Sequence, residues 1–364
     1  MKLPFYDIYS SYEENLKNGP PILNQKIDPP KRNIKKTYKF LGFKVNSLFG
    51  IPAGPLPNSK FMKAAFDFGF DVSVYKSVRS RIFPCHPYPN VLFVKSLTEL
   101  HPEKTPRLTT TNGNRKLDSK INITNSFGVP SLDPQTWQED VKKALSYEKT
   151  GQLLILSFMG TPPVDGTQKA FIDDFARTAK YAYETKAKML EVNLSCPNIG
   201  NEGLVCYDLD LTEKVCRVIR KNIGNTPLLV KVGYYKNDND LKKLAKIIVK
   251  YTNAVCAINT LQTEIVDKNG NQALPGPTRL RSGVCGSCIK WAGLEMVEKL
   301  NKIREKENYK FAIVGVGGVV TPDDYFEYRK AGADLVQSAT GAMFNQNLAL
   351  EIWKKENENK EVKI

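Results

Sequence analysis

The chain has 364 residues, 41% of them apolar, and it can therefore bury the core of one large domain. It has no run of about 18 apolar residues and no signal-peptide pattern, so neither a membrane span nor secretion is predicted. Its seven cysteines are odd in number and scattered, which argues against a disulfide scaffold and predicts a cytoplasmic protein. The net charge of +15 comes from lysines spread over nearly every predicted helix, so we expect no nucleic-acid partner.

Residues 1–45 are predicted to be an N-terminal extension, because they are polar, rich in proline and basic toward their end. After them, eight short apolar runs alternate with amphipathic helical stretches, which is typical of a closed parallel (β/α)8 TIM barrel. The barrel is predicted over 46–356, with an insertion at about 78–125 after the second strand and a charged tail at 357–364. The predicted strands lie at 48–54, 71–76, 153–158, 189–195, 227–233, 254–260, 311–317 and 334–339, and the insertion contains one more apolar run at 121–125.

Short capping patterns mark the ends of some predicted helices. Asp210 and Glu213 form a capping-box pattern, which predicts that a helix begins beside them. Thr321, followed by a proline, predicts the start of another helix, and Gly332 predicts its end. The apolar faces of these helices are expected to pack against the barrel.

One motif, Asn193-Leu194-Ser195-Cys196-Pro197-Asn198, stands where the fourth predicted strand gives way to a loop. A cysteine among hydrogen-bonding amides can exchange a proton near neutral pH if its pKa is lowered or its substrate is acidic enough. The alternative is a buried cysteine that only packs. Asn193 and Asn198 favour the chemical role, because two amides suit a planar ligand with alternating carbonyl and N–H groups.

Other polar residues also fall at the ends of predicted strands, which a parallel barrel gathers on one face. Lys76 ends the second strand, and Lys231 stands in the apolar run of the fifth. The glycines at 315–318 and the small residues at 339–341 follow the last two strands, where such barrels bind phosphate. Neither cysteine nor lysine carries electrons, so redox chemistry would need a cofactor, and a phosphate site with a lysine beside a flat pocket suits flavin mononucleotide (FMN).

The pair Cys285 and Cys288 has the spacing of a zinc or redox motif. A structural zinc site needs four ligands, and no second pair of residues is suitably spaced, so we predict no metal.

The hexapeptide at 193–198 resembles the signature of the class 1 dihydroorotate dehydrogenases, and the resemblance extends from about Phe49 to Leu350. The membrane-bound class of that family has serine in place of Cys196 and an apolar N-terminal anchor, and this sequence shows neither trait. The shared motifs occur in the same order: Ala53-Gly54, Tyr75-Lys76-Ser77, Asn125 to Pro130, the strand with Lys231, Ile258-Asn259-Thr260, Gly283 to Lys290, and Gly315 to Gly318.

The resemblance implies FMN-dependent oxidation of dihydroorotate to orotate in pyrimidine biosynthesis, by a homodimer. Cys196 would remove a proton from C5 of dihydroorotate while a hydride passes from C6 to the flavin. The residues that would bind substrate are Lys76, Asn125, Phe127, Gly128, Val129, Asn193, Asn198, Asn259 and Thr260. Those that would bind FMN are Ala53, Gly54, Lys76, Ser77, Asn125, Asn193, Lys231, Gly286, Gly317, Gly318, Ala339 and Thr340.

Departures from the family pattern leave two alternatives open. Residues 199–206 resemble the flavin domain of dihydropyrimidine dehydrogenase, and residues 261–276 are longer and more polar than expected. The first alternative is an oxidoreductase of an uncharged dihydropyrimidine, against which Lys76 and the loop at 125–130 argue. The second is an RNA-modifying flavoenzyme like the tRNA dihydrouridine synthases, although those carry glycine at the position of Ser195. The electron acceptor and the role of residues 1–45 stay open.

Overall fold

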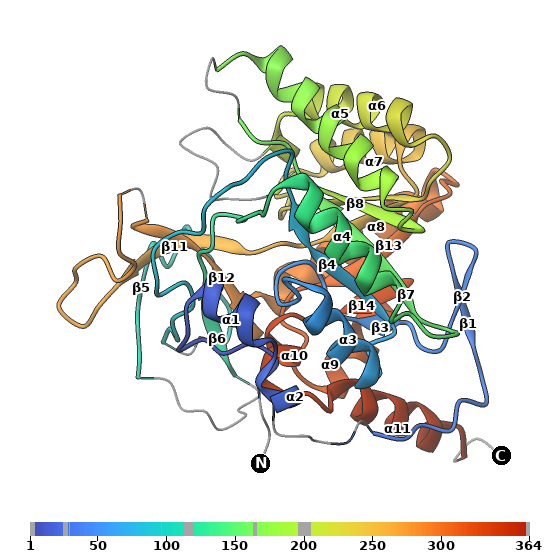
Figure 1. The fold of residues 1–364 in the computed structure, drawn as a ribbon, viewed down its shortest axis with the longest axis horizontal. Helices are drawn as coiled ribbons and strands as arrows, with labels where there is room; N and C mark the ends of the chain where they lie inside the picture. The colour runs from blue at the N-terminus through green and yellow to red at the C-terminus, as the bar shows by residue number, and fades with distance from the viewer. Residues whose placement is uncertain are drawn as a thin grey trace.

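The structure, a computed structural model, describes residues 4–24, 28, 30–95, 97–112, 120–162, 166–195, 205–277 and 279–361. In this part of the chain, eight parallel strands form one curled sheet in the order β3-β14-β13-β10-β9-β8-β7-β4 (Figure 1). The backbone N–H of Val74 donates to the carbonyl of Ile51 at 2.8 Å and links the two edge strands, so the barrel is nearly closed. The strands are β3 (Phe49–Gly50), β4 (Val72–Val78), β7 (Leu153–Phe158), β8 (Met189–Asn193), β9 (Leu228–Val232), β10 (Ala254–Ala257), β13 (Ala312–Val316) and β14 (Leu335–Gln337).

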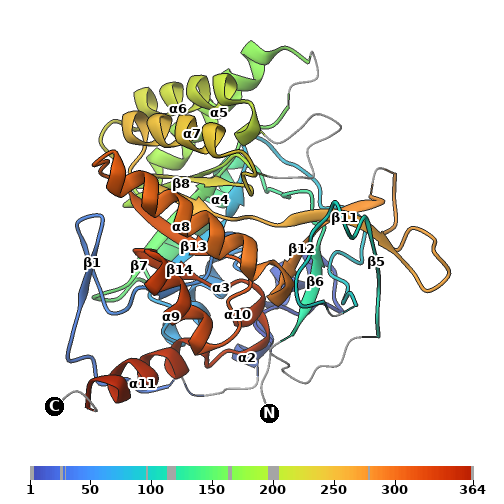
Figure 2. The same cartoon turned by 180° about the vertical axis from the view of Figure 1, so that it is seen from behind.

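Helices follow the strands and surround the barrel, which confirms the predicted parallel TIM barrel (Figures 1 and 2). No helix in the described ranges is long and apolar enough to cross a membrane. The helices around the barrel are α3 (Ser59–Asp67), α4 (Pro134–Leu145), α5 (Gln168–Glu184), α6 (Leu209–Ile223), α7 (Asp238–Tyr251), α8 (Lys290–Lys306), α9 (Pro322–Ala331), α10 (Thr340–Phe344) and α11 (Leu348–Glu361), with short 3-10 turns at Val205–Tyr207 and Ser287–Ile289.

Two helix starts test the capping predictions. The side chain of Asp208 caps α6 by accepting from the backbone N–H of Leu211, so the predicted cap at Asp210 is wrong. Asp210 lies in the first turn instead, where a negative charge favours the helix N-terminus. The prediction for α9 is confirmed: Thr321 caps its start, and Gly332 ends it with a φ of 109°.

The N-terminal end of the barrel interior is filled by apolar side chains. The antiparallel hairpin of β1 (Tyr38–Phe40) and β2 (Phe43–Val45) contributes Phe40 and Val45 to this cluster. They pack with the first residues of the barrel strands, such as Val72 and Leu153. Because apolar packing closes this end of the barrel, the polar groups gather toward the opposite end.

A second, smaller sheet stands beside the barrel, with the order β5-β11-β12-β6. Its strands β5 (Arg107–Thr109) and β6 (Asn122–Asn125) come from the insertion, and β11 (Leu261–Val266) and β12 (Arg281–Gly286) follow β10. The predicted run at 121–125 is thus a strand, whereas β11 was missed although its alternating burial is typical of a strand with one face covered. The sheet places Asn125 opposite Gly283 and carries both segments over the C-terminal ends of the barrel strands.

The residues before the barrel pack against it. The helices α1 (Tyr12–Asn18) and α2 (Pro21–Asn24) begin this segment, and Phe5, Ile8 and Ile22 belong to the hydrophobic core. The backbone N–H of Phe5 donates to the carbonyl of Met343 at 2.9 Å. The sequence suggested a polar extension, but its few aromatic and aliphatic side chains are the ones that are buried.

Candidate active site

Two adjoining cavities lie at the C-terminal ends of the barrel strands. The larger has a volume of about 730 Å³ and the smaller one of about 440 Å³. Parallel barrels bind their ligands at this end, because the loops after the strands meet there. The residues that line both cavities are Ala53, Gly54, Asn125, Phe127, Lys231 and Asn259.

One wall of the larger cavity is built from glycine turns. Gly318 has a φ of 70°, and a Cβ on it would lie 2.7 Å from the backbone nitrogen of Lys290. The hydroxyl of Tyr328 donates to the carbonyl of Gly317 at 2.6 Å and holds the turn from outside. Gly317 and Gly318 line the cavity with backbone alone, as phosphate binding requires. Gly286, Ala339 and Thr340 line the same cavity.

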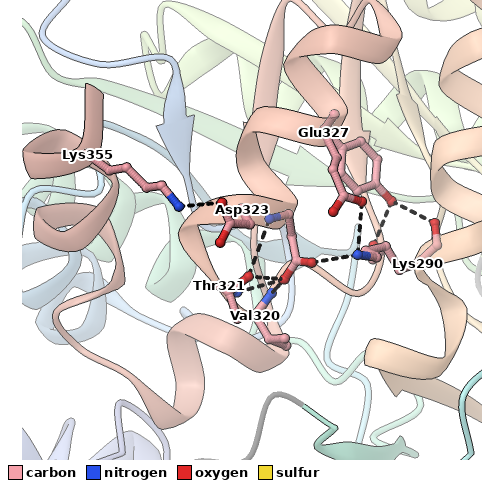
Figure 3. A network of polar contacts seen from close by, with 9 residues as sticks. Lys290, Val320, Thr321, Asp323, Glu327 and Lys355 are labelled. Atoms are coloured by element: carbon pink, nitrogen blue, oxygen red, sulfur yellow. Dashed lines mark hydrogen bonds and ion pairs between the residues drawn. The ribbon is translucent and has the colours of Figure 1, made fainter. Parts of the chain in front are cut away.

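A polar network fixes the chain just after this turn (Figure 3). Asp324 accepts from the backbone N–H groups of Val320 and Thr321, at 2.9 and 2.8 Å. Its other oxygen accepts from Lys290 Nζ at 2.8 Å, and Glu327 lies 2.9 Å from the same ammonium. The network ties the starts of α8 and α9 together, so the glycine turn between β13 and α9 is held in one conformation.

The larger cavity fits a flavin with a phosphate at the glycine turns. Lys231 is only 4% exposed, and its Nζ lies 3.5 Å from the carbonyl oxygen of Ala53. A lysine in this position brings a positive charge to the cavity. The hydroxyl of Thr260 lines the cavity and has no hydrogen-bond partner among the described residues, so a polar group remains for a ligand to satisfy.

The smaller cavity holds a second ammonium. Lys76 is 7% exposed, and its Nζ lies 3.4 Å from the carbonyl oxygen of Gly54. The same Nζ lies 4.7 Å from the ring centre of Phe127 and 5.8 Å from that of Tyr12. Aromatic faces stabilise a cation, and an ammonium on the wall of this cavity is a group that can bind an anionic ligand.

The loop after β6 lines this cavity, and its carbonyl groups accept hydrogen bonds from other parts of the chain. The carbonyl of Ser126 accepts from Arg279, that of Phe127 from the backbone N–H of His86, and that of Gly128 from Arg79. In a planar trans peptide the N–H points opposite the carbonyl. The N–H groups of residues 127–129 therefore point away from these partners, and none of them donates to a backbone carbonyl in the described chain.

Two buried arginines donate most of the hydrogen bonds that hold this loop. Arg79 is fully buried and donates to the carbonyls of Gly128 and Val129, at 3.0 and 2.8 Å. Arg279 donates to the hydroxyl and carbonyl of Ser126, both at 3.1 Å. Burial lowers the pKa of Arg279 from its ordinary value. The loop also needs glycine at position 128, because φ is 76° there and a Cβ would lie 2.5 Å from the His86 ring.

The structure brings the sequence-predicted site residues together wherever it describes them. Lys76, Ser77, Gly128, Val129 and Asn193 line the smaller cavity, and Thr260 with the predicted phosphate residues lines the larger one. Cys196 and Asn198 lie outside the described residues. The chemical roles of all these residues stay predictions.

Sequence reasoning missed Tyr6, Arg79 and Arg279. Tyr6 comes from the N-terminal segment, lines the larger cavity, and packs edge-on against Phe127 with ring centres 5.6 Å apart. Its hydroxyl is buried without a partner in the described ranges. These three residues differ from exposed tyrosines and arginines only because they are buried, and a sequence pattern does not report burial.

The two cysteines of the 285–288 pair do not meet further metal-binding groups. Cys285 lines the larger cavity, and burial raises its pKa to about 11. Cys288 is buried, and its pKa is raised to about 12. Within the described ranges, no group of three or more histidine, cysteine, aspartate or glutamate side chains could hold a metal ion.

A parallel barrel with a glycine-lined cavity beside a lysine-lined one is the arrangement expected of a flavin-dependent barrel oxidoreductase. The sequence model of the family described as dihydroorotate dehydrogenase matches residues 40–359. The chain belongs to the dihydroorotate dehydrogenase family, and it is an oxidoreductase that acts on CH–CH bonds.

The chain is similar to several named relatives. It is 36% identical to a dihydroorotate dehydrogenase of Dictyostelium discoideum over 371 residues, which is 98% of each chain. It is 26% identical, over 66% of this chain and 73% of the relative, to the catalytic subunit of dihydroorotate dehydrogenase B (NAD(+)) of Brachyspira hyodysenteriae. It is 29% identical to the protein of the same name from Methanocaldococcus jannaschii, over 60% of this chain and 66% of the relative. The first alignment also covers nearly all of the N-terminal segment, for which the sequence alone suggested no counterpart.

Proposed function

We propose that this chain oxidises dihydroorotate to orotate with FMN as its flavin and Cys196 as the base. The observation that carries the proposal is the adjacency of the two cavities, one lined by glycine turns and the other by Lys76 and the loop 126–130. This arrangement suits a phosphate-bearing flavin beside a small anionic substrate.

In this proposal, Lys76 and the N–H groups of residues 127–129 bind the substrate carboxylate. Hydrogen bonds to a charged group contribute about 1.5–3 kcal/mol each, so these donors would favour a substrate that carries a carboxylate. Asn125, Asn193 and Asn259 would pair with the carbonyl and N–H groups of the pyrimidine ring.

The remaining roles concern the flavin and the proton. Gly317 and Gly318, with the start of α10, would hold the phosphate, and Lys231 would lie toward the ring. Bound FMN supplies the acceptor for the hydride from C6 of dihydroorotate. The thiolate of Cys196 would take the proton from C5, as the family resemblance implies.

Anaerobic mixing with dihydroorotate or dihydrouracil tests the substrate. We expect dihydroorotate to bleach the flavin absorbance faster by several powers of ten, because a substrate without the carboxylate leaves a site built for it unsatisfied. Lys76→Ala should remove most of this preference. Lys149→Ala is the control, because Lys149 is an exposed lysine paired with Asp67 at the other end of the barrel. Equal rates with both substrates, or faster bleaching by dihydrouracil, would favour the uncharged dihydropyrimidine.

The identity of the flavin is tested separately. Heat-denatured protein should release FMN and no dinucleotide, as chromatography with fluorescence detection can measure. A purified protein that is colourless and takes up no FMN on reconstitution would overturn the whole mechanism.

We also propose a cytoplasmic homodimer. The six cysteines in the described ranges are all free thiols, which supports a reducing compartment. The dimer rests on the family resemblance, and analytical ultracentrifugation of the purified protein would test it.

A further inference from the structure

Inside the barrel, beneath the cavities, lies a carboxyl group that the proposed mechanism does not use. Glu191 stands on β8, two residues before Asn193, and its side chain is fully buried. Neither carboxyl oxygen has a hydrogen-bond partner among the described residues. Burying an ionised carboxyl without partners costs several kcal/mol, so a carboxyl kept in this place calls for a chemical explanation.

The titratable groups that face Glu191 come from two neighbouring strands. Lys231 lies on β9, where it is in register with Asn193, and Cys256 lies on β10, in register with Lys231. Burial raises the pKa of Glu191, and the ammonium of Lys231 acts in the opposite direction. Burial also raises the pKa of Cys256 well above its usual value, so that group stays a neutral thiol.

A pair of hydroxyls leads from Glu191 toward the substrate cavity. Ser157 on β7 is in register with Glu191, so the two side chains lie beside each other on the same side of the sheet. The oxygens of Ser157 and Ser77 lie 2.7 Å apart, and Ser77 lines the smaller cavity. Hydroxyls both donate and accept, so this pair can pass a proton between the cavity and the interior of the barrel.

We propose that Glu191 takes up one proton from solvent, through Ser77 and Ser157, when the flavin in the larger cavity is reduced. The proposal rests on the proposed function, because it requires a flavin beside Lys231. The two electrons come from dihydroorotate, and the proton comes from bulk water and ends on a carboxyl oxygen of Glu191.

The charges explain the coupling. With the flavin oxidised, burial favours the protonated carboxyl of Glu191, and the ammonium of Lys231 is the group that favours its ionised form. Reduction adds negative charge to the flavin in the cavity. This charge attracts the ammonium of Lys231 and repels an ionised carboxyl of Glu191 beneath it. Both effects favour the protonated carboxyl, so reduction and proton uptake support one another. The net charge buried in the barrel then changes less during turnover.

Redox titration of the flavin-loaded protein at several pH values tests the proposal. Each proton taken up with two electrons lowers the midpoint potential by about 30 mV per pH unit, because one pH unit is a tenfold change in proton concentration. We expect the midpoint potential of Glu191→Gln to fall by about 30 mV less per pH unit than that of the wild type, which corresponds to one proton fewer. A pH-indicator dye in weak buffer should likewise count one proton fewer for the variant. Ser157→Ala should slow proton uptake without changing its extent.

Glu148→Gln is the matched control. Glu148 also has a pKa raised by burial, but it pairs with Lys188 at 3.2 Å, just before β8 and far from the cavities. Its variant should keep the wild-type slope. Equal slopes for wild type and Glu191→Gln would overturn the proposal. If the substitution prevents folding, a wild-type proton count of one per flavin reduced would overturn it as well. A protein that binds no flavin, or that dihydroorotate does not reduce, would instead refute the proposed function.

Discussion

Replacing Arg79 by lysine tests whether the substrate loop is held in place from behind. The guanidinium is fully buried and donates to the carbonyls of Val129, Gly128 and Gly160 and to the hydroxyl of Thr161. It also stacks on Phe83, with its central carbon 4.0 Å from the ring centre. Lysine keeps the charge but has a single nitrogen, so it cannot reach acceptors on both sides of the guanidinium plane.

The expected cost follows from these contacts. If lysine leaves two of the acceptors without a donor, each loss costs about 1–3 kcal/mol, so the free energy of unfolding should fall by about 2–6 kcal/mol. The released carbonyls of Gly128 and Val129 would also let the opposite N–H groups turn away from the smaller cavity. We therefore expect the KM for dihydroorotate to rise by about tenfold to a hundredfold, as the loss of one or two oriented hydrogen bonds implies.

Two assays separate stability from positioning. Urea unfolding followed by tryptophan fluorescence gives the free energy, and anaerobic flavin reduction at 10 °C or below gives the substrate dependence of a protein that is still folded. Affinity for FMN should stay within about twofold, because Arg79 does not line the larger cavity. A variant with lowered stability but an unchanged KM would refute the idea that hydrogen bonds from Arg79 to the loop carbonyls orient the loop N–H groups toward the substrate.

Three further variants test other parts of the structure. Cys196→Ala should keep its flavin but slow flavin reduction by about 10²–10⁴ in stopped-flow absorbance, as for the loss of a general base, and a native rate would show that the thiol only packs. Gly318→Ala should weaken FMN binding and lower stability by about 1–3 kcal/mol, whereas Gly166→Ala, at a similar φ of 68° but with nothing within 4 Å, should cost only the backbone strain and leave flavin affinity unchanged in a fluorescence titration. The flavin-free protein should lose stability as pH rises above about 4.5, by up to about 1.4 kcal/mol per pH unit until the raised pKa of Glu191 is reached, because the folded state alone keeps the proton. Glu191→Gln should remove this part of the pH dependence in urea unfolding, and an unchanged pH profile would mean that Glu191 is already ionised in the fold.

The sequence predicted the barrel well because strand and helix patterns are local. Each of the eight predicted runs overlaps an observed strand, although the first, β3, is reduced to two residues and the second, β4, extends two residues beyond its run. It did not predict the small sheet, because β11 pairs with β5, which lies far earlier in the chain. Long-range pairing of this kind depends on what the rest of the chain presents, and no local pattern encodes it.

Some residues of the candidate site could be predicted from the sequence, and others could not. Lys76 and the turn at Gly317 could be found because strand ends of a parallel barrel meet on one face. Arg79 could not, since its chemistry depends on complete burial and on carbonyls 49 or more residues away. Glu191 was visible in the sequence beside the signature motif, but nothing in its spacing shows that its carboxyl faces the barrel interior without a partner.

The position of the N-terminal segment has a consequence for how the protein is made. Phe5 bonds to Met343, which follows the last barrel strand, so its partner is synthesised only after the barrel strands, whereas Tyr6 packs on Phe127, which is made much earlier. Until Met343 is made, the side chains of Phe5, Tyr6 and Ile8, which the finished fold buries, cannot all reach their final places, and exposed apolar side chains favour chaperone binding. Contacts between such distant parts of a chain also form slowly. The wall of the larger cavity that Tyr6 provides therefore belongs to a segment that is fixed only when the barrel strands are complete, and cofactor loading should follow that step.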